Sequence, residues 1–196
     1  MSGRFDITTH FPTQFIDQAK KSPVLNVEEA NPNFQLMYFG FKASRPLVAD
    51  KRVREAMSIT VDREAIKKSI MRGMSVPASI IVAPGVNGHE VAIDKPAAVD
   101  VNKAKKLMAD AGYPDGFRFT LSFTVDRLPG DKEIGTTLVQ MLARIGIQVQ
   151  ANGVPVSILF AAQPGHGELT NRFGIVRVAA GGNVLIVSHN RFFGQI

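Results

Sequence analysis

Few side chains in this sequence have the types and spacing that chemistry requires. His89 with Glu90, and His166 with Glu168, are the two places where a histidine and a carboxylate lie close enough in the chain to share a metal ion. A structural or catalytic metal needs three or four converging ligands, and the chain has no Cys. The pairs therefore favour histidines in exposed loops, with a metal site as the alternative. We expect no bound metal and no cofactor.

The acidic residues are explained better by structure than by catalysis. Asp50 and Asp62 stand where helices are predicted to begin, and Asp110 and Asp115 stand near a predicted turn, which are positions that Asp commonly occupies. Residues 84–88 (PGVNG) resemble a phosphate loop, but neither a Lys nor a predicted helix follows. The sequence motifs of nucleotide-binding loops, zinc proteases and serine hydrolases are absent. We therefore expect no catalytic residue and no enzyme.

Two short amphipathic helices are predicted within residues 46–73. Asp50 is a suitable N-cap for the first and Asp62 for the second, and Gly73 fits just past the second helix. Apolar residues recur at the spacing of one helix face: Val53, Ala56, Met57, Ile66 and Ile70. These patterns alone are typical of ordinary surface helices and indicate no function.

A strand, a helix and a second strand are predicted between residues 117 and 149. Apolar and polar residues alternate over residues 117–125, which predicts a half-buried strand. An apolar stripe runs from Ile134 to Ile145 and ends at Gly146, and Ile147 and Val149 begin the next strand. This order predicts a βαβ unit with a right-handed crossover.

Shorter patterns complete an α/β sequence. Strands are predicted near residues 4–9, 24–27, 34–41 and 173–179, helices over 12–21, 100–111 and 155–163, and a loop rich in Pro and Gly over 74–99.

Composition permits more than one kind of partner. With 196 residues and 45% hydrophobic content the chain can build one core. The net charge of +6 is compatible with a polyanion such as nucleic acid, but the basic residues are spread along the chain and no nucleic-acid motif accompanies them. We expect a solvated basic surface and no nucleic acid partner. A stand-alone basic domain that binds nucleic acid or another polyanion is the alternative.

Four ordered segments resemble solute-binding proteins of the peptide/nickel ABC-importer family. The most specific is residues 36–66, where LMYFGF is followed by Pro46, DKRVREA and VDREAI. Three further segments fit in order: GRFDI at 3–7, DVNKAKKLMADAGYPDGF at 100–117, and LARIGIQV at 142–149. The resemblance covers the chain from about residue 3 to about residue 165.

This resemblance implies an extracytoplasmic binding protein. Family members have two α/β lobes joined by a hinge that close over a ligand, and nothing is chemically transformed. The expected fold is an incomplete periplasmic-binding-protein type II-like lobe with a mixed sheet flanked by helices, occupying residues 1–196 as one unit with an atypical tail over 166–196. The expected ligand is a peptide or a similar small solute (a nickel complex, sugar or opine), and the expected partner is a membrane permease. The parent protein would be periplasmic, although the N-terminus of this chain has no signal-peptide core.

The resemblance also suggests where a ligand would lie. Many relatives place Trp and then Asp in a Gly-rich turn after a late strand, and the Asp holds the amino terminus of a peptide. In this chain Ala180 stands near the Trp position and Asn183 near the Asp position, so the charge is lost while an acceptor remains. The predicted ligand-binding residues are Phe123, Thr124, Gly181, Gly182 and Asn183, with core packing as the alternative for the first two.

Two other expectations follow from a chain that matches mainly the second lobe. A lone lobe is expected to bind peptide weakly or not at all, because a cleft needs two walls. Apolar area that another lobe would cover favours self-association. A degenerate or truncated product without a ligand is a third hypothesis beside the binding protein and the polyanion-binding domain.

Overall fold

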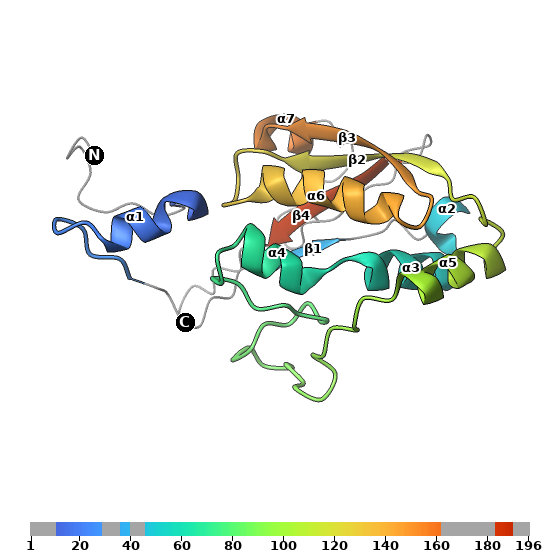
Figure 1. Ribbon diagram of the computed structural model, residues 1–196, viewed down its shortest axis with the longest axis horizontal. Coiled ribbons are helices and arrows are strands. Elements are labelled where there is room, and N and C mark those ends of the chain that lie inside the picture. Colours follow the sequence, from blue (N-terminus) through green and yellow to red (C-terminus); the bar gives the residue numbers. More distant parts are fainter. Residues whose placement is uncertain (1–10, 29–35, 40–45, 162–182, 190–196) are drawn as a thin grey trace.

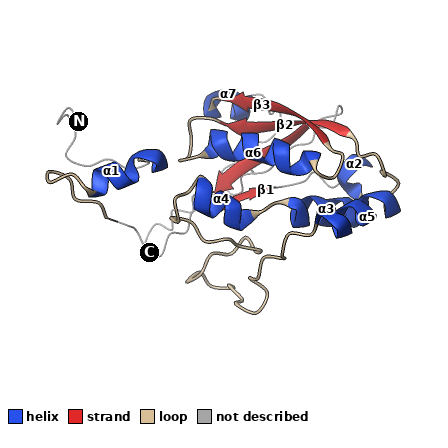
Figure 2. Cartoon of the chain, viewed as in Figure 1, coloured by secondary structure: helices blue, strands red, loops and turns tan. Residues whose placement is uncertain are grey.

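The computed structural model describes residues 11–28, 36–39, 46–161 and 183–189, in which helices pack against a four-stranded mixed sheet (Figure 1, Figure 2). The strands are β1 (Leu36–Phe39), β2 (Arg118–Thr124), β3 (Gln148–Val154) and β4 (Asn183–His189). Their order across the sheet is β1-β4-β2-β3. β2 is parallel to both β3 and β4, whereas β1 is antiparallel to β4.

The helix pair predicted within residues 46–73 is confirmed, with a short helix before it. These helices are α2 (Pro46–Ala49), α3 (Lys51–Thr60) and α4 (Arg63–Ser69). Asp50 caps α3 by accepting from the Arg52 N–H, and Asp62 caps α4 by accepting from the Ala65 N–H, both at 2.8 Å. Short acceptors at these positions satisfy amide groups that have no partner within the helix, so the sequence specifies both starts.

Helix α5 (Val101–Asp110) packs on α3. Its N-cap is Asp100, which accepts from the Lys103 N–H at 2.8 Å and donates its own N–H to the Ile59 carbonyl of α3. Lys103 also forms an exposed ion pair of 2.8 Å with Glu55, which raises the pKa of the lysine. The loop 74–99 links α4 to α5 without a helix or strand, as predicted.

The βαβ unit is also confirmed. Helix α6 (Asp131–Ala143) connects β2 to β3, and the two strands pair in parallel from Arg118 opposite Gln148 to Thr124 opposite Val154. Helix α7 (Val156–Ala161) follows β3 and contacts β2. Where the strands begin, Gly116 and Gly146 touch through their backbones: a Cβ on Gly116 would lie 2.1 Å from the Gly146 carbonyl oxygen. Two of the segments that carry the family resemblance therefore meet at this point.

One apolar core joins the sheet to the helices. Leu121, at 0% exposure, belongs to it, and α6 lies against the face of β2 that carries Phe119, Leu121 and Phe123. The largest fully buried side chains come from both halves of the chain: Val48, Val53, Met57, Met108, Phe119, Leu121, Leu142 and Ile147. Since α3, α5, α6 and the sheet share this cluster, we treat the described part around it as one packed body.

Some predicted elements differ from the structure. The strand predicted at 24–27 is wrong: these residues form no strand, and Val24 is 81% exposed, so its apolar pattern meets no sheet face. The helix predicted over 12–21 is a 3-10 turn (Thr13–Phe15) followed by α1 (Ile16–Lys20). The strands predicted at 4–9 and 173–179 lie outside the described residues. Strand β4 was not predicted.

Candidate functional site

The carboxyl ends of the parallel strands form the best candidate site. In open α/β sheets ligands bind outside these ends, because loops there combine exposed backbone groups with side chains from neighbouring strands. In this chain the ends of β2 and β3 continue into residues 124–131 and 154–156. We call these two segments the carboxyl edge.

Asp131 fixes the first loop of the carboxyl edge. Its carboxylate is buried and accepts from the N–H groups of Arg127, Leu128 and Lys132 at 3.1, 3.3 and 2.8 Å. An acidic side chain in the first turn of α6 also interacts favourably with the positive end of the helix. These hydrogen bonds therefore tie the loop after β2 to Asp131, the first residue of α6.

Asp126 connects the two loops. Its carboxylate accepts from the Val156 N–H at 2.8 Å, and the Val125 N–H donates to the Val154 carbonyl at 3.2 Å. These bonds bring the end of β2 and the start of α7 together. Sequence reasoning did not select Asp126 or Asp131, although an Asp directly after Pro129-Gly130 and before an apolar helix was a detectable signal.

Phe123 and Thr124 lie where the carboxyl edge begins, but both side chains are buried, at 4% and 5% exposure. The ring of Phe123 fills the space over two glycines: a Cβ on Gly135 of α6 would lie 2.4 Å from the ring, and one on Gly153 of β3 would lie 3.2 Å from it. This packing brings α6 close to the sheet. In the described residues Phe123 contributes to the core, and ligand contact remains a prediction for both residues.

The structure does not bring Asn183 to the same place. Asn183 begins β4 and pairs with Thr120, whereas Phe123 pairs with Ile186 further along the strand. Since β2 and β4 are parallel, Asn183 lies toward the amino ends of the strands, roughly 10 Å along the strand direction from Phe123. Gly181 and Gly182 lie outside the described residues. The five predicted ligand residues therefore do not form one described cluster.

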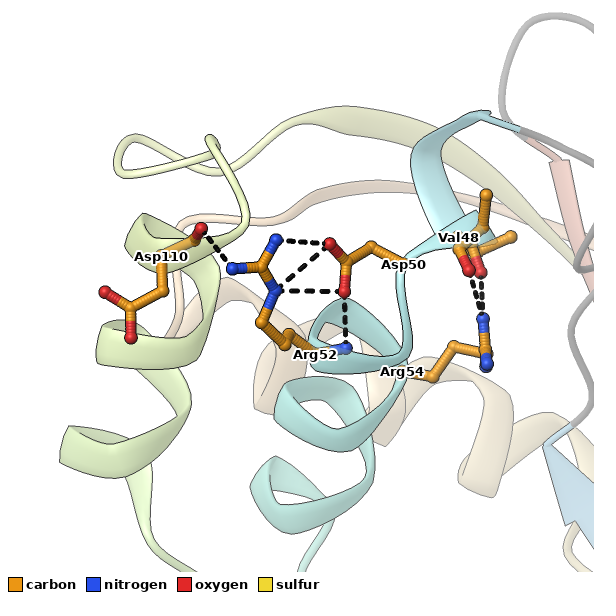
Figure 3. A network of polar contacts seen from close by, with 6 residues as sticks. Val48, Asp50, Arg52, Arg54 and Asp110 are labelled. Atoms are coloured by element: carbon orange, nitrogen blue, oxygen red, sulfur yellow. Dashed lines mark hydrogen bonds and ion pairs between the residues drawn. The ribbon is translucent and has the colours of Figure 1, made fainter.

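The charged motif DKRVR at residues 50–54 joins neighbouring helices through side-chain hydrogen bonds (Figure 3). The Arg52 guanidinium holds Asp50 by contacts of 2.6–3.1 Å and donates to the Asp110 carbonyl at the end of α5 at 2.6 Å. Its hydrogen bonds lower the pKa of Asp50 to about 2. Arg54 donates to the carbonyls of Val48 and Ala49, both at 2.7 Å. The motif thus fixes α2 and α5 onto α3.

His89 lies in the loop 74–99 but is not the exposed residue that the sequence predicted. Its Nε2 is 3.0 Å from a carboxylate oxygen of Asp94, and the two side chains are only 11% and 12% exposed. Asp94 also accepts from the Ser79 N–H at 2.8 Å, and the amides and the His89 hydrogen bond lower the pKa of this carboxyl. The contact between His89 and Asp94 joins two parts of the same loop.

Within the described ranges, no three His, Asp or Glu side chains gather closely enough to hold a metal ion. The described helices are also too short or too polar to cross a bilayer. His10 and His166 lie outside the described residues.

Comparison with known proteins identifies relatives over most of the chain. Residues 1–183 match the family described as bacterial extracellular solute-binding proteins, family 5 Middle. The glutathione-binding protein GsiB of Escherichia coli O1:K1 / APEC is 28% identical over 159 residues, which is 81% of this chain and 30% of that protein. The chain therefore spans about a third of the length of the curated relatives it matches.

Solved structures share the fold. A dipeptide-binding protein from Pseudoalteromonas sp. SM9913, in complex with Met-Leu, has a TM-score of 0.74 at 22% identity, covering 92% of this chain and 33% of that one. The oligopeptide-binding protein AppA from Bacillus subtilis, in complex with a nonapeptide, has a TM-score of 0.70 at 22% identity, covering 92% and 36%.

Proposed function

Since the chain belongs to the bacterial extracellular solute-binding proteins of family 5, we propose that it supplies one wall of the ligand site in the binding component of an ABC importer. Its fold is a partial lobe of the periplasmic-binding-protein type II class, with an open mixed sheet. Proteins of this family are periplasmic or extracytoplasmic and bind peptides or small solutes for importers. The observation that carries the proposal is the family match over residues 1–183.

The proposed ligand is a short peptide. GsiB is a glutathione-binding protein, and the two structural neighbours are in complexes with a dipeptide and a nonapeptide. The carboxyl edge suits such a ligand, because a peptide main chain needs donors and acceptors on a rigid frame rather than a reactive group. Asp126 and Asp131 provide that rigidity by holding both loops through backbone amides.

The proposed site is shared with a second wall. The chain covers only 30–36% of the relative and the two neighbours described above, and binding proteins of this class close two lobes over the ligand. A ligand on one wall stays largely in water and gains little from burial. We therefore expect this chain alone to bind glutathione or Met-Leu with a dissociation constant above about 1 mM.

Isothermal titration calorimetry tests the proposal. The 196-residue chain and a longer protein that includes both lobes are each titrated with glutathione, Met-Leu and a nonapeptide. The longer protein is expected to bind at least one of them with a dissociation constant in the micromolar range, about a thousandfold tighter than the chain. Micromolar binding by the chain itself would contradict the proposal that the ligand site needs a second wall. Failure of the longer protein to bind any of them would contradict the peptide ligand.

A permease in the membrane is the partner that this function requires, and docking to it is part of the proposal. The alternative, a domain that binds a polyanion through its net charge of +6, makes a different prediction. Binding to single-stranded DNA that weakens steeply as salt rises would favour it, since each neutralised phosphate releases counterions.

A further inference from the structure

Strand β3 lies at one end of the sheet order, and among the described residues β2 is its only neighbour. Such an edge strand presents unpaired main-chain groups along its outer side. Most side chains of β3 are exposed, with Val149 and Val154 partly buried. Within the part of the chain that the structure describes, the strand is thus accessible over its length, and α7, which follows it, packs on β2.

The pairing with β2 determines which main-chain groups of β3 point outward. The Gln148 N–H donates to the Phe117 carbonyl at 2.8 Å, and the Val154 carbonyl accepts from the Val125 N–H at 3.2 Å. In a parallel ladder one residue uses both its groups on one side, and the next uses both on the other. The N–H and C=O groups of Val149, Ala151 and Gly153 therefore point away from β2.

These three outward residues are self-complementary. If a second copy of β3 runs antiparallel with Ala151 opposite Ala151, then Val149 lies opposite Gly153 on both sides of the centre. Each of these opposed pairs exchanges both N–H···O bonds, since all three residues present donor and acceptor together. The arrangement is two-fold symmetric, as an isologous dimer requires.

The charges of the strand also permit this pairing. No residue from Gln148 to Val154 is charged, and none is Pro, so the usual groups that protect an edge from its own copy are missing. Arg118 hydrogen-bonds the Gln148 side chain at the start of β3, and Asp126 holds the Val156 N–H just past its end. Antiparallel pairing turns the Arg118 end of one copy toward the Asp126 end of the other.

Space for an added strand exists beside this edge. A hollow of about 660 Å³ is bounded by α6 and by the first half of β3, with Val139 and Ala143 on the helix side and Gln148 and Gln150 on the strand side. With Ala151 opposite Ala151, the second copy places Gly153 opposite Val149 beside this hollow, so its backbone can approach there without a side chain in the way. The hollow lies at the amino ends of the strands, whereas the carboxyl edge lies at the opposite ends, where Val154 faces Gln148 of the second copy in this register.

We propose that the edge of β3 is a docking surface for a second copy of this chain, which pairs antiparallel about Ala151 and extends the sheet across a two-fold axis. Because one strand edge buries less area than a standard stable interface, the dimer is weak and concentration-dependent.

A charge-reversal pair at Ala151 tests this surface. Sedimentation velocity is measured over a concentration series for the unchanged chain, for Ala151→Lys, for Ala151→Glu and for an equimolar mixture of the two variants. Asn102→Lys adds the same charge as Ala151→Lys at an exposed position of α5 and is the matched control. Circular dichroism verifies that each variant is folded.

The unchanged chain and Asn102→Lys are expected to shift from 21.3 kDa toward twice that mass as concentration rises. Each Ala151 variant alone is expected to stay monomeric, because like charges then lie directly opposite each other at about 5.5 Å between Cα atoms. The mixture is expected to regain the dimer. A monomeric unchanged chain, single variants that still associate, or a mixture that stays monomeric would each overturn the proposal.

Discussion

The contact between Gly116 and Gly146 gives a sharp prediction about what holds the βαβ unit together. Gly116 has a φ of +76° and precedes β2, and Gly146 has a φ of +82° and precedes β3. A Cβ added to Gly116 would lie 2.1 Å from the carbonyl oxygen of Gly146 and 2.3 Å from its carbonyl carbon. Both obstacles are backbone atoms, so no side-chain rotation can relieve the clash. We expect Gly116→Ala to be strongly destabilising.

The magnitude follows from two costs. An alanine in the left-handed region costs about 1–2 kcal/mol, and forcing the starts of two paired strands apart adds about 1–3 kcal/mol. The matched control is Gly112→Ala: Gly112 has a φ of +90° but nothing within 4 Å of its added Cβ. Gly112→Ala should lose only the free energy of placing alanine in the left-handed region. The difference between the two variants therefore measures the cost of the clash with Gly146.

Urea unfolding followed by circular dichroism supplies the assay, with both variants compared to the unchanged chain. Gly116→Ala is expected to lower the free energy of unfolding by about 2–5 kcal/mol and Gly112→Ala by about 1–2 kcal/mol. Equal losses for the two variants would refute the claim that the glycines are required by close backbone approach.

Two further substitutions test the Asp50–Arg52 ion pair and the apolar core. Asp50→Asn is expected to lower the urea midpoint at pH 7. Hydrogen bonds from Arg52 lower the pKa of Asp50 from 3.8 to about 2, so the stabilisation is present above pH 4 and is lost as the pH falls through 2. The difference from the unchanged chain should therefore shrink strongly between pH 4 and pH 2, and a difference that is undiminished at pH 2 would argue against the charge pair. Leu121→Ala, at a side chain with 0% exposure, is expected to cost about 2–5 kcal/mol of unfolding free energy, whereas Val76→Ala, at 81% exposure, should change it by less than about 0.5 kcal/mol. Similar losses for both would contradict the described core.

Local patterns in the sequence predicted the parts of the fold that depend on neighbouring residues. Asp50 and Asp62 cap their helices as expected, because an N-cap needs only an acceptor two or three residues before the amide that it binds. The alternation of apolar and polar residues in β2 and the apolar stripe of α6 likewise predicted the βαβ unit. Each pattern has the period of its element because each element buries one face.

Pairing between distant segments was not predictable in the same way. Nothing near Val24 reveals that no strand lies beside it, and nothing within residues 183–189 reveals that this stretch pairs with both β1 and β2. The role of Phe123 shows the same limit. A residue at the end of a strand can face a ligand or a helix, and Gly135, 12 positions later, leaves the space that its ring occupies.

The sequence showed the family resemblance because several residues that carry it make contacts that hold the fold together. Asp50, Arg52 and Arg54 join three helices, and Gly116 meets Gly146. The contacts described for these residues join helices and strand starts of the lobe, and none of them reaches the carboxyl edge. The sequence therefore identified the family through its architecture, while the ligand residues stay predictions.

The most direct test of the central claim is to map where a peptide touches this chain. Amide nitrogen–proton NMR spectra are recorded for the chain with and without about 10 mM Met-Leu, a concentration that populates even a weak complex. If the carboxyl edge is a wall of the ligand site, the perturbed amides should gather in residues 124–131 and 154–156. Perturbations confined to the amino ends of the strands, near Gly116 and Gln148, would contradict the account.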